Sequence, residues 1–178
     1  MICAKVLLMK RGFTLIEILV SITIVALISG GALIYMNNFN MRQKLNSSQE
    51  EVVSALKLAQ SYAKTRQLPL NSVESELNFV RIEVSSGGFL VARANSDVGT
   101  TFFSKLVNNN EIEVSTSPAV IYFWAGGGGR LSHDIDGTPY GVGETATVLV
   151  QRKILSSDYY QIVINALGQI SGVNYVAN

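Results

Sequence analysis

Residues 10–36 of the sequence read KRGFTLIEILVSITIVALISGGALIYM, and after Glu17 no charged side chain follows before Arg42. A helix rises about 1.5 Å per residue, so about 20 apolar residues cover the roughly 30 Å hydrocarbon core of a bilayer. The stretch therefore predicts a membrane-spanning helix over residues 13–36. Lys10 and Arg11 precede it. Basic residues on that side favour a cytoplasmic N-terminus, so the body of the chain is expected outside the cytoplasm.

Glu17 is the unusual residue of this stretch, because a carboxylate within a membrane costs on the order of 3 kcal/mol. A secretory signal peptide and a plain single-span anchor are alternative interpretations, but neither gives the acid a partner. If the chain is cut after Gly12, the new α-amino group of Phe13 can pair with Glu17 in the same helix or in a neighbouring subunit. Pairing between subunits would favour assembly, since an unpaired charge is expensive in a low dielectric.

The run K-R-G-F-T-L-I-E-I-L-V resembles the prepilin cleavage and methylation motif of type IV pilins and type II secretion pseudopilins. The resemblance implies that prepilin peptidase cuts between Gly12 and Phe13 and that the new N-terminus is methylated. It also implies that Glu17 pairs with the N-terminus of an adjacent subunit.

Residues 1–12 form the predicted leader peptide, and translation starts at either Met1 or Met9. Removing the leader leaves 11 basic and 13 acidic residues, so the mature chain is close to neutral. That balance gives no electrostatic reason to expect nucleic acid as a partner. The only cysteine, Cys3, leaves with the leader, so no disulfide is expected in the body.

Helical periodicity continues after the membrane segment and predicts an amphipathic continuation over residues 37–66. One face carries Leu45, Val52, Leu56, Ala59 and Ala63, with Gln49 at the remaining position of the same stripe, while Glu50, Glu51, Lys57 and Lys64 lie elsewhere. A single helix from Phe13 to Arg66 would be about 80 Å long. Pro69 is expected to end it. Gly30 and Gly31 mark either a weak point or a close-packing position within it.

From residue 67 the hydrophobic period changes to two, which is typical of strands. Strands are predicted at 79–84, 88–94, 119–124, 145–151 and 160–166, with a weaker one at 111–115, a closing hairpin through 167–173, and loops at 125–130 and 132–144. The predicted fold class is α+β, in which a long N-terminal helix packs on antiparallel β-sheets of a domain over residues 67–178. This arrangement is the pilin fold.

Three further stretches are similar to the H-type minor pseudopilins and the FimT-like minor pilins. They are VVSALKLAQSYAKTRQLPL (52–70), VIYFWAGG (120–127) and YYQIVINALGQISG (159–172). The resemblance implies two β-sheets packed on the helix. Gln60 departs from the pattern, because those relatives often carry arginine there.

Little in the sequence favours catalysis or a cofactor. His133, Asp134 and Asp136 lie close together and suggest part of a calcium loop, but the EF-hand pattern needs more oxygen ligands. A solvated turn is the preferred interpretation, and calcium is the one ion left open. No nucleophile and base stand in a familiar arrangement, so the chain is not expected to be an enzyme.

The expected function is that of a structural subunit in a type IV pilus-like filament, most like a minor pseudopilin or minor pilin. The expected partners are other subunits, prepilin peptidase, an inner-membrane assembly platform and, before assembly, membrane lipid. The protein would first be a single-pass protein of the inner membrane and then part of a pilus or periplasmic pseudopilus. A major type IV pilin and a membrane-tethered module that binds a ligand or DNA are the alternatives.

Overall fold

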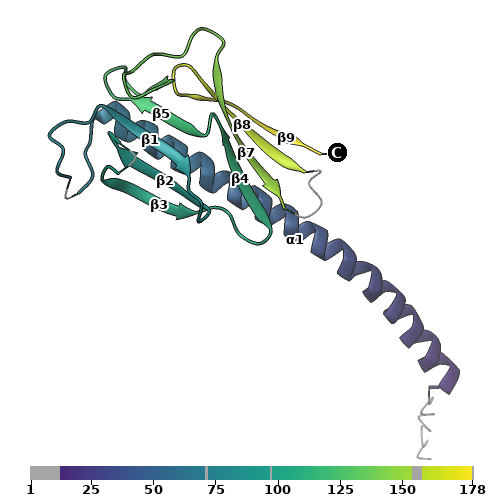
Figure 1. The fold of residues 1–178 in the computed structure, drawn as a ribbon. Helices are drawn as coiled ribbons and strands as arrows, with labels where there is room; N and C mark the ends of the chain where they lie inside the picture. Colours follow the sequence, from purple (N-terminus) through teal and green to yellow (C-terminus); the bar gives the residue numbers. More distant parts are fainter. Residues whose placement is uncertain (1–12, 71, 97, 154–157, 178) are drawn as a thin grey trace, which may run out of the picture. The chain divides into compact units, whose positions relative to one another are not determined.

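The computed structural model describes residues 13–70, 72–96, 98–153 and 158–177, with the side chains of all but residues 32–35. The chain divides into two compact units, Met1–Arg42 and Gln43–Asn178. Helix α1 (Leu15–Thr65) begins in the first unit and ends in the second (Figure 1). The boundary between the units falls inside the segment predicted as the amphipathic continuation.

In the first unit, α1 exposes every side chain that is described between Phe13 and Asn40. The helix is long and apolar enough to cross a membrane, by length and composition. It runs without a break through Gly30 and Gly31, and a Cβ added at either glycine would meet nothing within 4 Å. An apolar surface exposed all round a helix is stable only in lipid or against other apolar helices.

In the second unit, the predicted buried stripe of α1 is confirmed. Leu45, Gln49, Val52, Leu56, Ala59 and Ala63 are all buried, whereas Glu50, Glu51, Lys57 and Lys64 are exposed. The spacing of the apolar residues by three, four and seven thus places one face of the helix in the core of the body, and the charged side chains of the helix lie on the exposed face.

The C-terminal end of α1 is closed by a Schellman cap. The N–H of Gln67 donates to the carbonyl of Tyr62 at 3.2 Å, and the N–H of Arg66 donates to the carbonyl of Ala63 at 3.4 Å. Arg66 adopts a left-handed conformation with φ of 53°. The helix therefore ends at Thr65 through this cap, and Pro69 lies after it.

Two antiparallel sheets form the rest of the second unit (Figure 1). The five-stranded sheet has the order β3-β2-β1-β5-β6, built from β1 (Phe79–Val84), β2 (Phe89–Ala94), β3 (Thr101–Leu106), β5 (Val120–Trp124) and β6 (Arg130–Ser132). The four-stranded sheet has the order β4-β7-β8-β9, built from β4 (Ile112–Ser117), β7 (Thr145–Arg152), β8 (Tyr159–Asn165) and β9 (Ile170–Val176). The predicted α+β class, a long helix on antiparallel sheets, is confirmed.

Both sheets contact the part of α1 that belongs to the second unit. On the five-stranded sheet, Phe102 stacks on Tyr62 with ring centroids 4.6 Å apart. On the four-stranded sheet, the Tyr160 hydroxyl donates to the side-chain oxygen of Asn46 at 3.2 Å. The largest fully buried side chains, among them Phe123, Ile82, Leu131, Ile162 and Ile164, share one core with the helical stripe.

Two strands were missing from the prediction. Strand β3 was overlooked because its burial does not alternate: Phe102 and Phe103 are consecutive and both half-buried. Strand β6 lies where residues 125–130 and 132–144 were predicted as loops, and that prediction is wrong for Arg130 and Ser132. Three residues are too few to show a period, and β6 is defined by its pairing with β5, as in Phe123 with Leu131.

Candidate functional site

The start of α1 is a capped helix terminus. Thr14 is the capping residue, because its hydroxyl oxygen accepts the N–H of Glu17 at 3.3 Å and its carbonyl accepts the N–H of Ile18 at 3.3 Å. The sequence T-L-I-E fits the capping-box pattern, in which a threonine is followed three residues later by a glutamate. The local sequence therefore fixes where the helix begins, and it places Glu17 in the first turn.

Glu17 and Phe13 lie close to each other in the chain at this terminus. Phe13 comes directly before the capping residue and its side chain is 76% exposed. Glu17 is exposed in the first turn of α1. A negative charge is favourable there, because the first N–H groups of a helix give its N-terminus a partial positive charge. The side chains of Ile16 and Ile18 beside it are apolar and exposed. The carboxylate therefore lies within an apolar surface that is suited to contact with lipid or with another apolar helix.

One comparison with known proteins bears on this terminus. The family model described as the prokaryotic N-terminal methylation motif matches residues 7–33. The match includes Gly12, Phe13, Glu17 and the apolar segment as far as residue 33, and it supports a type IV pilin-like or pseudopilin precursor that is anchored in a membrane. A search of curated proteins and a search of solved structures each returned no match.

Gly12 and the rest of the predicted leader lie outside the described residues. Cleavage between Gly12 and Phe13, methylation of Phe13 and the choice between Met1 and Met9 stay predictions. The motif match suggests processing by prepilin peptidase and assembly with other pilin subunits.

Asp134 and Asp136, the weak candidates for a calcium site, lie in a turn. One carboxylate oxygen of Asp134 accepts the N–H of Asp136 at 3.1 Å and the N–H of Thr138 at 3.0 Å. Hydrogen bonds from the Thr138 hydroxyl and from these backbone N–H groups lower the pKa of Asp134. In the part of the chain that the structure describes, no three His, Cys, Asp or Glu side chains gather where they could hold a metal ion. The solvated turn stays the preferred interpretation, and calcium stays an untested alternative.

His133 belongs to a second contact in the same loop, which the sequence did not suggest. Its Nε2 lies 2.8 Å from a carboxylate oxygen of Glu144, and its ring stacks on Tyr140 with centroids 4.1 Å apart. The N–H of Gly141 and then His133 lower the pKa of Glu144, while burial and then the charge of Glu144 raise the pKa of Tyr140. These contacts close residues 132–144 into an ordered loop.

The glycine-rich segments pack on the one tryptophan. A Cβ added at Gly126 would lie 2.8 Å from the indole of Trp124, and one added at Gly127 would lie 2.6 Å from it. Gly137, in the other loop, is almost as close, since its Cβ would lie 3.0 Å from the indole. The glycines are needed here because the backbone approaches the ring more closely than any side chain allows.

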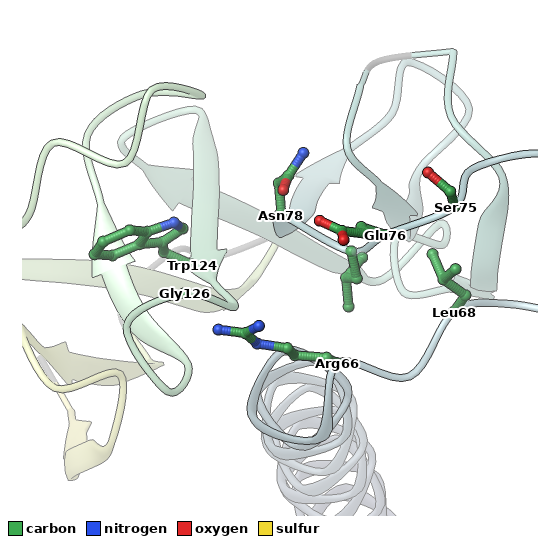
Figure 2. A pocket seen from close by; sticks show the side chains of 8 residues that line it. Arg66, Leu68, Ser75, Glu76, Asn78, Trp124 and Gly126 are labelled. Carbon is green, nitrogen blue, oxygen red and sulfur yellow. The ribbon is translucent and has the colours of Figure 1, made fainter.

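A hollow of about 320 Å³ lies beside Trp124, at the end of α1 (Figure 2). Its lining residues are Arg66, Leu68, Ser75, Glu76, Leu77, Asn78, Trp124 and Gly126. Arg66 enters from the helix end, and Glu76 and Asn78 come from the segment before β1 (Figure 2). Among the described residues that line it, the one cation, Arg66, and the one anion, Glu76, are both exposed, so these residues carry no excess of charge.

Proposed function

We propose that this chain is a non-enzymatic structural subunit of a type IV pilus-like filament. Prepilin peptidase would cut after Gly12, and the new N-terminus at Phe13 would be methylated. The observation that supports this most strongly is the methylation motif over residues 7–33, which covers the start of an exposed apolar helix with a single acid, Glu17.

The proposed mechanism is a transfer of the helix from lipid to neighbouring helices. Lipid tails are as apolar as the helix surface, so burial of apolar area alone hardly favours assembly over the membrane. A carboxylate that is unpaired in lipid and paired in the filament does favour assembly. The α-amino group of a neighbouring Phe13 would be that partner for Glu17, and it would also fix the register between subunits.

The proposed setting follows from the same arrangement. Before assembly the chain would be a single-pass protein of the inner membrane, with the body outside the cytoplasm because Lys10 and Arg11 precede the span. An inner-membrane platform would then extract it into a pilus or a periplasmic pseudopilus.

Within this class we propose a minor subunit, such as an H-type minor pseudopilin or a FimT-like minor pilin. The similarity of residues 52–70, 120–127 and 159–172 to those proteins supports this, and so do the two sheets that contact one helix. The alternatives are a major type IV pilin and a membrane-tethered module that binds a ligand or DNA.

Counting the chain in isolated filaments tests the proposal. We expect it in sheared filaments or pseudopili, in fewer copies than another pilin-like subunit, as measured by quantitative mass spectrometry. If it is the most abundant subunit, the chain is a major pilin. If it is recovered from membranes and never from filaments that assemble in the same cells, the filament role is wrong and a tethered module is favoured.

A further inference from the structure

Three charged side chains meet on one face of the five-stranded sheet. Glu83 accepts Nη2 of Arg81 at 2.7 Å with one carboxylate oxygen and Nη1 of Arg93 at 2.6 Å with the other. The side chains of Arg81, Glu83 and Arg93 are only 15%, 22% and 28% exposed. Two cations share one anion, so this arginine cluster carries one uncompensated positive charge.

The guanidinium group of Arg81 has two hydrogen-bond donors that are unpaired among the described residues. Its Nε and Nη1 atoms are buried and have no hydrogen-bond partner among the residues that the structure describes. Buried donors in folded proteins are nearly always paired, with protein groups, water or a ligand. The unpaired donors therefore indicate that a partner of opposite polarity belongs beside Arg81.

A hollow of about 280 Å³ lies there, lined by Arg81, Asn95, Ser96, Tyr122 and Ile135. The hydroxyl groups of Ser96 and Tyr122 have no hydrogen-bond partner in the described part of the chain, so both can donate into the hollow. None of the described side chains that line it is a carboxylate. This distinguishes it from the hollow beside Trp124, where Glu76 offsets Arg66.

Asn95 holds the wall of the hollow in place. Its side-chain oxygen accepts the N–H of Asn78 at 2.7 Å, and its side-chain nitrogen donates to the carbonyl of Glu76 at 2.7 Å. It does so from a left-handed conformation with φ of 59°. Its side-chain oxygen and one of its two side-chain N–H donors are thus used by the protein, and Arg81 and the two hydroxyl groups offer further donors to a ligand.

We propose that this hollow binds the carboxylate of a small organic acid. A guanidinium and hydroxyl donors are suited to an oxyanion, and the planar guanidinium matches a carboxylate. The single excess charge of the arginine cluster equals that of one carboxylate, whereas a phosphate group carries about −1.5 to −2. The ring of Tyr122 and the side chain of Ile135 supply apolar surface for the carbon that bears the carboxylate. Binding at this hollow does not rest on the proposed filament role.

An NMR titration of the full-length protein in detergent micelles tests the site. Sodium acetate is the probe, sodium phosphate the competing oxyanion, and sodium chloride keeps the ionic strength constant. We expect saturable shifts of the Asn95 and Ser96 amides with acetate, and weaker binding of phosphate. Arg81→Gln should weaken acetate binding by about tenfold or more, because it removes the charged donor. Tyr122→Phe should weaken it less.

Two more variants keep the result unambiguous. Ile135→Trp fills the hollow from an exposed position and leaves the arginine cluster intact, so it should also abolish binding. Arg130→Gln removes an exposed arginine of β6 outside the hollow and should change nothing, as a matched control. The proposal is overturned if acetate shifts do not saturate, if Arg81→Gln and Ile135→Trp bind acetate like the unchanged protein, or if phosphate binds more tightly.

Discussion

Glu17→Ala is expected to keep the protein out of filaments while leaving its insertion into the membrane intact. The acid is the only charged residue of α1 before Arg42, and removing it makes the span more apolar. The variant would lose the pairing with the α-amino group of Phe13 in the next subunit. An unpaired carboxylate in the membrane costs on the order of 3 kcal/mol, so relieving that cost by assembly favours each added subunit by about a hundredfold.

Conservative variants separate charge from shape. Glu17→Gln keeps the size of the side chain and removes its charge, so it should fail like Glu17→Ala, while Glu17→Asp should assemble in part. Ser21→Ala is the matched control one turn further on, where the hydroxyl only donates to the carbonyl of Glu17 at 2.7 Å. The readout is the amount of each variant in sheared filaments relative to membranes. Assembly of Glu17→Gln at the level of the unchanged protein would show that the charge has no role.

Gly168→Ala is expected to destabilise the body by about 2–5 kcal/mol. Gly168 lies in the turn between β8 and β9 with φ of 75°, where a side chain is strained. A Cβ there would lie 2.1 Å from the carbonyl oxygen of Gly129 and 2.9 Å from Nε2 of Gln60. Gly129 is itself pressed against α1, since its own Cβ would lie 2.8 Å from Cγ of Lys64. The turn, the glycine-rich loop and the helix therefore cannot move apart without loss of core contacts.

Gly128→Ala is the matched control for this variant. Its φ is 69°, yet a Cβ there would meet nothing within 4 Å. It should cost only the backbone strain of about 1–2 kcal/mol. Alanine restricts the unfolded chain equally in both variants, so that contribution cancels in the comparison. Urea unfolding of the full-length protein in detergent measures the difference. Equal midpoints for the two variants would mean that the close contact with Gly129 does not carry the stability assigned to it.

The helical part of the fold could be predicted because its signals are local. The spacing from Leu45 to Ala63 sets one buried face, and the strands 79–84, 145–152 and 159–165 show their period within six to eight residues. Strand β6 could not be predicted this way, since only its pairing with β5 makes it a strand. The C-terminal cap at Arg66 could not be predicted from the sequence either, because arginine rarely adopts the left-handed conformation that this cap requires.

The candidate sites divide in the same manner. Phe13 and Glu17 belong to a continuous motif, so the sequence alone points to them. The arginine cluster depends on the register of two strands, in which Arg81 faces Arg93. Alternation in FVRIEV places Arg81 and Glu83 on one face, and this signal was available. The unpaired donors of Arg81 and the hydroxyl groups that share its hollow follow only from the folded chain.

The mass of the N-terminal peptide in isolated native filaments tests the central claim most directly. A trimmed subunit would yield a peptide that begins at Phe13 and carries one methyl group on its α-amino nitrogen. Gly12→Val, in which the residue before the cut is changed, should instead retain the leader and stay in the membrane. If functional filaments contain subunits that still carry residues 9–12, no free amine at Phe13 exists to meet Glu17, and the proposed assembly mechanism is wrong.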